Sequence, residues 1–154
     1  MVEKNIMEYY REIDRYGKVN TDFFERVAEK MNVSSVDVFV LSAEIHVKEG
    51  YLNGEYCTQQ NLAQTWVYPK QTIHSSVERL KKKGLVTLEP IPGNKKEKAI
   101  VLTEEGHKLV DLHMITAFEK MNRAMLRLLP EERETLCRLM GRLVDGIEEE
   151  MEDL

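Results

Sequence analysis

Apolar residues recur at helical spacing along almost the whole chain, and a single stretch breaks that pattern. Residues 85–90 and 98–103 are two short β-prone runs, and the turn-forming sequence IPGNKKE joins them. Such a pair predicts a β-hairpin. The chain is therefore expected to be mainly α-helical with one small hairpin, and its 154 residues are enough to bury a sizeable core.

The residues before the hairpin predict two helices separated by a sharp bend. Thr58 is a candidate N-cap for a short helix that carries Leu62 and Trp66 on one face. Pro69 favours a new helix start, and Gly84 suits a left-handed helix end about fifteen residues later. A short helix, a turn and a longer basic helix form a helix-turn-helix, so the hairpin that follows takes the place of a wing.

Both ends of the chain predict further helices. Residues 23–31 and 34–47 each show helical spacing, and Gly17 is expected to weaken the first of these helices. A long helix is expected after Thr103 as its N-cap, and a last helix is expected to restart at Pro130.

The last predicted helix has an apolar stripe at i, i+3/4, i+7 spacing. Its members are Leu136, Leu139, Met140, Leu143, Ile147 and Met151. A stripe of this length needs a cover. The cover is either the core of the same chain or a second copy of it, and in the second case these residues make the dimer interface.

Positive charge is confined to one stretch of an acidic chain. The formal net charge is −5, yet residues 69–98 hold eight Lys or Arg residues against three Glu residues. The mean charge therefore hides a basic surface between acidic segments, which suits a polyanionic partner.

Several classes of function lack their motifs. The chain has no GxSxG, GxGxxG, Walker or HExxH motif, so neither an enzyme nor a cofactor is expected, and no catalytic residue is assigned. Cys57 and Cys137 lie far apart without metal-ligand spacing, which is typical of a reduced intracellular chain. No apolar run has the length of a signal peptide or of the ~20 residues that span a bilayer, so we expect a soluble cytoplasmic protein without a membrane partner.

The segment 60–106 resembles a known family. Its marks are the Leu62–Ala63 step, VERL followed by KGLV, and LTEEG at the end of the hairpin. These marks resemble the winged helix-turn-helix core of the multiple-antibiotic-resistance-regulator (MarR) family. The resemblance implies a homodimeric transcriptional regulator, expected to be a repressor, that binds a pseudo-palindromic double-stranded DNA operator. It also implies three parts: an N-terminal dimerisation helix (1–33), a winged helix-turn-helix lobe (34–103) and C-terminal dimerisation helices (104–154).

The second helix of the helix-turn-helix is the expected reading element. With Ile73, Val77 and Leu80 turned inward, its other face can enter a major groove. Gln71, His74 and Ser75 are the candidates for base contacts. The remaining candidates, which suit phosphates or the wing contact, are Thr58 and Gln59 at the exposed start of the preceding helix, Lys70, Thr72, Arg79, Lys81, Lys82, Asn94, Lys95, Lys96 and Lys98.

Two departures from the family and one alternative bear on these candidates. Asn94, Lys95 and Lys96 stand where the family often has Asp and then Arg, so the forked geometry of Arg is lost. Ser75 stands where an Arg often reaches a base. A Lys-rich helix end is also commonly just a solvated terminus that complements the helix dipole, and the basic face could instead bind a protein partner.

Several residues are candidates for regulation, and each has an ordinary structural alternative. The resemblance implies a small aromatic or lipophilic effector in a cleft, and the candidates are Tyr16, Phe23, Phe24, Phe39, Trp66 and Tyr68, which could equally be ordinary core residues. Cys57 could sense oxidants or be a plain buried thiol, and Cys137 is expected to be structural. His107 and Asp111 could bind a metal or be a solvated helix pair; the expectation is no metal site.

Overall fold

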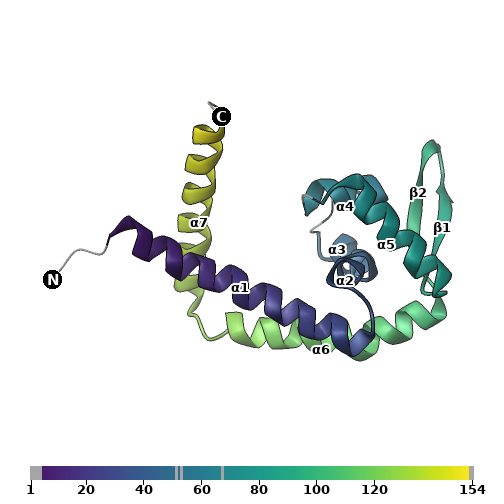
Figure 1. Ribbon diagram of the computed structural model, residues 1–154, viewed down its shortest axis with the longest axis horizontal. Helices are drawn as coiled ribbons and strands as arrows, with labels where there is room; N and C mark the ends of the chain where they lie inside the picture. The colour runs from purple at the N-terminus through teal and green to yellow at the C-terminus, as the bar shows by residue number, and fades with distance from the viewer. Residues whose placement is uncertain (1–4, 51, 53, 67, 153–154) are drawn as a thin grey trace. The chain divides into compact units, whose positions relative to one another are not determined.

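The computed structural model describes residues 5–50, 52, 54–66 and 68–152 (Figure 1). The described elements, in chain order, are α1 (Ile6–Met31), α2 (Ser35–Leu41), α3 (Ala43–Lys48), α4 (Gln59–Thr65), α5 (Lys70–Lys82), β1 (Val86–Ile91), β2 (Asn94–Leu102), α6 (Glu104–Met125) and α7 (Pro130–Met151). The chain divides into two compact units between Ile115 and Thr116, so α6 contributes to both. The expectation of a mainly helical chain with one hairpin is confirmed.

Buried aliphatic and methionine side chains fill the core of the first unit. Leu41 of α2, Leu62 of α4 and Met114 of α6 are fully buried, as are Val77 and Leu80 of α5. Burying a side chain of this size stabilises a fold by about 1.5–3 kcal/mol relative to leaving it exposed. This core holds α4 and α5 in a fixed mutual orientation, which a helix-turn-helix needs.

The hairpin is tighter than the sequence predicts. β2 begins at Asn94, so the connection is a short turn at Pro92 and Gly93 rather than the seven residues 91–97. Gly93 has a φ of +77°, a conformation that glycine adopts without steric cost. The Asn94 side-chain oxygen accepts hydrogen bonds from the backbone amides of Lys96 and Glu97, so these contacts also hold the tip of the hairpin in place.

The helix expected over residues 34–47 is two helices. Ser34 caps α2 and forms a capping box with Asp37. The break falls at Ser42, whose hydroxyl donates to the backbone oxygen of Phe39 at 3.0 Å and lies 2.9 Å from Nε2 of His46. A serine hydroxyl that hydrogen-bonds to nearby backbone competes with continuation of the helix, and the spacing of apolar residues does not reveal such a bond.

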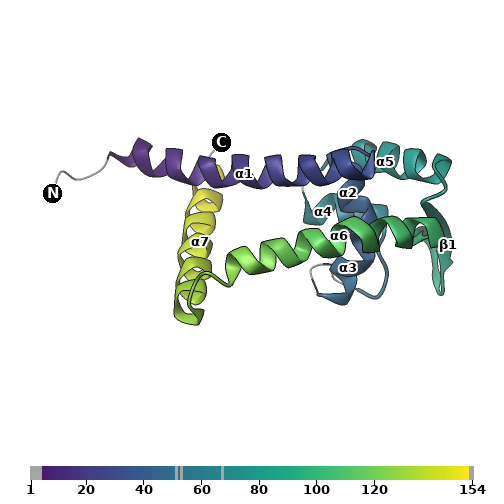
Figure 2. The same cartoon turned by 90° about the horizontal axis from the view of Figure 1, so that it is seen from below.

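A set of close contacts fastens the base of the hairpin to the end of α5. Gly84 has a φ of +70°, as expected for a left-handed helix end, and its carbonyl accepts from the Thr103 hydroxyl at 2.6 Å. The Thr103 hydroxyl in turn accepts from the amide of Gly106, which makes it the expected cap of α6. A Cβ on Gly106 would lie 2.1 Å from the carbonyl oxygen of Leu85, so this contact requires glycine. Figure 2 shows the hairpin beside α5 and the start of α6.

Two long helices have largely uncovered apolar side chains. α1 runs through Gly17 without a break, because one glycine costs only about 1 kcal/mol in a helix. Its described residues 5–19 are all exposed, Ile13 and Tyr16 among them. α7 has no buried residue. No described helix combines the length and the apolar character that crossing a membrane requires.

Candidate nucleic-acid interface

α4 begins with a capping box that also ties it to the hairpin. The Thr58 hydroxyl accepts from the amide of Asn61, and the Asn61 side chain accepts from the amide of Thr58. The same hydroxyl donates to the Glu97 carboxylate of β2 at 3.0 Å. The backbone joins the two as well, through a bridge between Thr58 and Ala99. The start of α4 and the hairpin therefore form one connected surface.

α5 presents two faces of different chemistry, as the sequence predicts. Ile73, Val77 and Leu80 are at most 1% exposed and face the core. Lys70, Gln71 and His74 lie on the opposite side, toward solvent. The helix thus offers amide, imidazole and ammonium groups on a rigid element.

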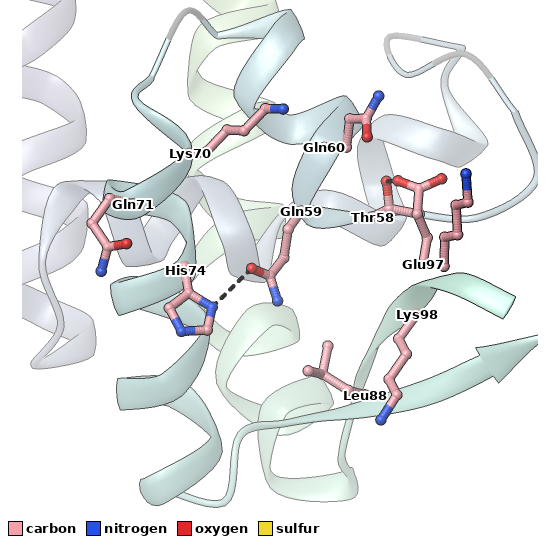
Figure 3. Close-up of a pocket in the computed structure, with 10 residues that line it drawn as sticks. Thr58, Gln59, Gln60, Lys70, Gln71, His74, Leu88, Glu97 and Lys98 are labelled. Carbon is pink, nitrogen blue, oxygen red and sulfur yellow. Dashed lines mark hydrogen bonds between the residues drawn. The ribbon is translucent and has the colours of Figure 1, made fainter.

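An open groove of about 420 Å³ runs between these helices and the hairpin (Figure 3). Its lining residues are Thr58, Gln59 and Gln60 from the start of α4, Lys70, Gln71 and His74 from α5, and Leu88, Lys96, Glu97 and Lys98 from the hairpin. Nδ1 of His74 lies 3.2 Å from Oε1 of Gln59, which links the two helices across the groove floor. Three lysines against one glutamate make the groove electropositive.

Seven of the residues predicted to contact DNA line this groove: Thr58, Gln59, Lys70, Gln71, His74, Lys96 and Lys98. Two more, Asn94 and Lys95, line a second hollow of about 350 Å³ along the hairpin tip. Thr72, Ser75 and Lys82 lie on α5 outside both hollows, with Thr72 and Ser75 half-buried and Lys82 exposed.

Thr58 does not form the exposed helix start that the sequence suggests. Thr58 is only 7% exposed, and its hydroxyl is hydrogen-bonded to both Asn61 and Glu97. A capping threonine paired with a distant strand cannot be recognised from local spacing.

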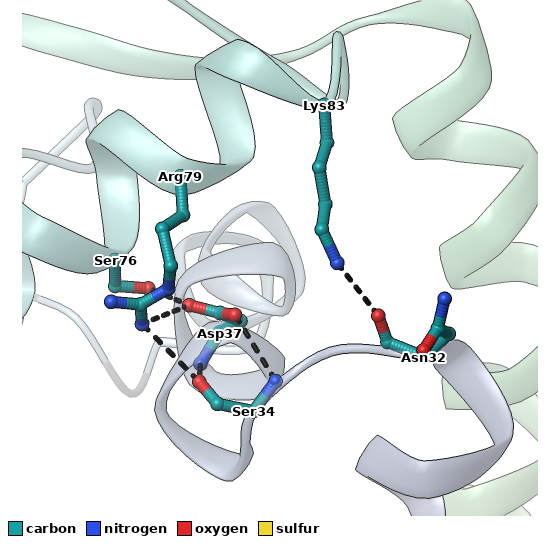
Figure 4. A network of polar contacts seen from close by, with 6 residues as sticks. All are labelled: Asn32, Ser34, Asp37, Ser76, Arg79 and Lys83. Atoms are coloured by element: carbon teal, nitrogen blue, oxygen red, sulfur yellow. Dashed lines mark hydrogen bonds and ion pairs between the residues drawn. The ribbon is translucent and has the colours of Figure 1, made fainter.

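The basic end of α5 is largely tied into the fold (Figure 4). Nη2 of Arg79 donates to the Asp37 carboxylate at 2.8 Å and to the Ser34 hydroxyl at 3.3 Å. Ser76, fully buried, donates to the same Asp37 oxygen at 2.5 Å. Lys83 donates to the backbone oxygen of Asn32 at 2.7 Å. Arg79 and Lys83 therefore fasten this end of α5 to the elements before it, whereas Lys81 pairs with Glu78 within α5 and Lys82 is exposed.

Asp37 is the centre of this network and is 2% exposed. Burial alone would raise the pKa of its carboxyl group, but hydrogen bonds from Ser76, Arg79 and Ser34 outweigh burial and lower the pKa below its usual value. No local pattern distinguishes Asp37, since an aspartate near a helix start is accounted for as a cap.

Three groove residues escaped the sequence prediction. Gln60 follows Gln59 in the first turn of α4, so its neighbour was a usable signal. Leu88 is apolar and was assigned to the strand alone. Glu97 alternates with Lys96 and Lys98, but a pattern of positive charge does not single out an acidic residue.

The aromatic candidates form a cluster, with one exception. The ring of Phe39 lies 5.4 Å from Phe24, 5.7 Å from Trp66 and 6.0 Å from Tyr68, and Phe23 lies 5.4 Å from Phe24. The His46 ring lies 4.6 Å from that of Trp66 at an interplanar angle of 58°, and burial lowers the pKa of His46 to about 4. Tyr16, in contrast, is 67% exposed on α1.

Neither the two thiols nor His107 has surroundings typical of a reactive or metal-binding site. Cys57 is buried, and burial together with the Glu44 carboxylate raises the pKa of its thiol to about 12. Cys137 is expected to be structural, yet it is exposed on α7 and belongs to no described core. Nε2 of His107 lies 3.7 Å from a Glu44 oxygen. No cluster of three or more metal-ligating side chains occurs among the residues described.

The apolar stripe of α7 is exposed to solvent along most of its length. Leu136, Leu139, Met140 and Ile147 are between 39% and 49% exposed, and Leu143 is half-buried. Within the described chain the stripe therefore still lacks a full cover.

Comparisons with known proteins agree with this geometry. Residues 50–97 match the sequence model of the MarR family. The HTH-type transcriptional repressor NicR of Pseudomonas putida is 32% identical over 91 residues, which make up 59% of this chain and 58% of NicR. The matched region is thus less than two thirds of that relative's length.

Solved structures share the fold over nearly the whole chain. Sco3205 from Streptomyces coelicolor, a MarR family transcriptional regulator in complex with DNA, has a TM-score of 0.72 at 19% identity, covering 96% of this chain and 94% of that one. BpsR of Bordetella bronchiseptica, whose DNA binding is regulated by 6-hydroxynicotinic acid, has a TM-score of 0.64 at 18% identity, covering 89% and 98%. These findings confirm the resemblance: over residues 50–97 the chain matches the MarR family in sequence, and its fold is that of MarR-family regulators.

Proposed function

We propose that this protein is a sequence-specific DNA-binding transcriptional repressor of the cytoplasm that acts as a homodimer. The observation that carries the proposal is the electropositive groove, in which α4, α5 and the hairpin bring Gln71, His74 and three lysines to one surface. NicR, a repressor, and Sco3205, in complex with DNA, support the same assignment.

The proposal divides the interface residues by chemistry. Gln71, His74 and Ser75 contact base edges in the major groove, where an amide pairs with adenine N6 and N7. Gln59 and Lys70 bind phosphates and fix the register, as do Thr72 and Lys82. Asn94, Lys95, Lys96 and Lys98 follow the hairpin to an adjacent minor groove or its phosphates. Thr58 and Arg79, which have partners inside the fold, serve by holding α4 and α5 in place.

A homodimer explains the uncovered stripe of α7 and the exposed residues of α1. Two copies related by a two-fold axis place their α5 helices about 34–36 Å apart, the spacing of successive major grooves, and read a pseudo-palindrome. The parts that serve this are residues 1–33 and 104–154, with Leu136, Leu139, Met140, Leu143 and Ile147 in the interface; residues 1–4 and 153–154 lie outside the described range.

A small aromatic or lipophilic effector is proposed to release the DNA. The cluster of Phe23, Phe39, Trp66 and Tyr68 joins α1, α2 and the end of α4, so a ligand bound there would change the spacing of the reading helices. Regulation of BpsR by 6-hydroxynicotinic acid supports this part. Such a ligand acts only through a difference in affinity between the two states.

A mobility-shift assay on the DNA upstream of the protein's own gene tests the proposal. A discrete shifted band that persists with excess nonspecific competitor is the expected result. Smeared binding that disappears with competitor, or none, would contradict sequence-specific regulation and favour a protein partner for the basic face.

A further inference from the structure

Glu97 is the one acidic side chain among the groove's lining residues. Its carboxylate lies on β2 between Lys96 and Lys98, which line the same groove. A negative charge in a surface meant for phosphates weakens attraction to any duplex. A residue at this position therefore needs a reason other than affinity.

The carboxylate is held in place rather than left mobile. Oε1 accepts from the Thr58 hydroxyl at 3.0 Å, and Oε2 accepts from the side-chain amide of Asn94 at 3.2 Å. The backbone amide of Glu97 donates to Asn94 at 3.1 Å, so the side chain has fixed partners on α4 and on the hairpin. Both side-chain partners are uncharged, so these hydrogen bonds add no positive charge to offset the carboxylate.

A fixed charge of this sign acts differently on two ways of binding DNA. Nonspecific complexes let phosphates move along the cationic groove, and a phosphate that comes near Thr58 meets the carboxylate. In one fixed register a base edge can face Glu97 instead, and in the minor groove a carboxylate can accept a hydrogen bond from the N2 amino group of guanine. Repulsion against the wrong complex is a common means of specificity.

We propose that Glu97 is a specificity-determining residue, whose carboxylate weakens binding to nonspecific DNA more than binding to the operator. This inference rests on the proposed DNA-binding function. It assigns to Glu97 a role separate from that of the lysines, which raise affinity for all duplexes alike.

Fluorescence anisotropy with two duplexes tests the proposal. One duplex carries the site upstream of the gene, and the other is a scrambled sequence of the same length and composition. E97Q keeps an acceptor for Thr58 and removes the charge, so affinity for the scrambled duplex should rise about tenfold while affinity for the operator changes less than about threefold. The specificity ratio then falls. An unchanged ratio in E97Q would overturn the inference.

Matched variants separate the charge from its location and from folding. E89Q removes the same charge from an exposed position on β1 that is outside the groove, and its ratio should equal that of the wild type. E97M is neutral and cannot accept a hydrogen bond from Thr58, and its specificity ratio should fall as in E97Q. If the specificity ratio falls in neither variant, the inference is overturned. If the wild type itself fails to discriminate between the duplexes, the proposed function fails. If it discriminates and E97Q does so equally well, only the role of Glu97 fails.

Discussion

The Arg79 guanidinium lies 2.8 Å from the Asp37 carboxylate, and this contact joins the reading helix α5 to α2. Asp37 is 3% exposed at its side chain and Arg79 is 49% exposed, so one partner is buried and the other reaches solvent. A run of basic residues that suggests phosphate binding thus also has a structural use.

Replacing Asp37 should destabilise the first unit. Asp37→Ala leaves the buried Ser76 hydroxyl and the Arg79 guanidinium without their acceptor, which should lower the free energy of unfolding by about 2 kcal/mol. Urea unfolding followed by circular dichroism measures this. Asp22→Ala is the matched control, because the Lys18–Asp22 pair on α1 is exposed to solvent and should contribute far less to stability. Equal losses in both variants would contradict a role for burial.

The network also predicts acid sensitivity. The pKa of Asp37 is lowered in the folded protein, so its contribution to stability is present above the unfolded pKa and is lost as the pH falls through the folded pKa. This loss therefore belongs to strongly acidic pH, below the range in which histidine acts.

His46 should make the protein less stable at mildly acidic pH. Burial lowers its pKa from 6.5 to about 4, so the unfolded chain binds the proton more readily and stability falls as the pH drops from 6.5 toward 4. His46→Gln removes the titration and should flatten the stability profile across this window. Denaturant unfolding at pH 7.5 and pH 5 provides the measurement. A variant with the same pH dependence as the wild type would show that His46 is not the cause.

Gly106 is predicted to be irreplaceable at the start of α6. A methyl group there would lie 2.1 Å from the Leu85 carbonyl oxygen, so Gly106→Ala must displace backbone at the hairpin base. We expect a loss of about 2 kcal/mol or more in unfolding free energy. Gly17→Ala, at a site with nothing within 4 Å, should instead stabilise α1 by about 0.5–1 kcal/mol. Both are read from thermal or urea unfolding, and a neutral Gly106→Ala would contradict the close approach.

The α7 stripe predicts a dimer that charge can separate. Analytical ultracentrifugation should give twice the 18.0 kDa of one chain. Leu139→Glu with Ile147→Glu places charges in the apolar stripe and should yield a monomer, whereas Arg138→Glu on another face of α7 should leave the dimer intact. A wild-type monomer, or a dimer in all variants, would refute an α7 interface.

Sequence periodicity predicted the elements that local chemistry determines. The inward face of α5, the Thr58 cap, the Gly84 helix end and the Thr103 cap are all confirmed, because each depends on residues within one or two turns. The seven groove residues followed from the same reasoning, since a helix face and a hairpin were enough to place them.

Contacts between distant segments could not be predicted in this way. The Asp37–Arg79 pair joins residues 42 positions apart, and the Thr58–Glu97 hydrogen bond joins residues 39 positions apart. The break at Ser42 depends on a hydroxyl that bonds backward to Phe39. In each case a polar side chain changes role through a partner that the linear spacing does not reveal.

The salt dependence of operator binding tests the central claim most directly. With about four phosphates neutralised per protomer, the slope of log K against log salt concentration should be about −7 for the wild-type dimer. Removing Lys70, Lys96 and Lys98 together should reduce the slope to about −2, because six of those contacts are lost per dimer. Replacing Lys30, Lys48 and Lys120 by Ala removes the same charge elsewhere and should leave the slope near the wild-type value. A wild-type slope near zero, or a groove variant that keeps the full slope, would contradict DNA binding through this groove.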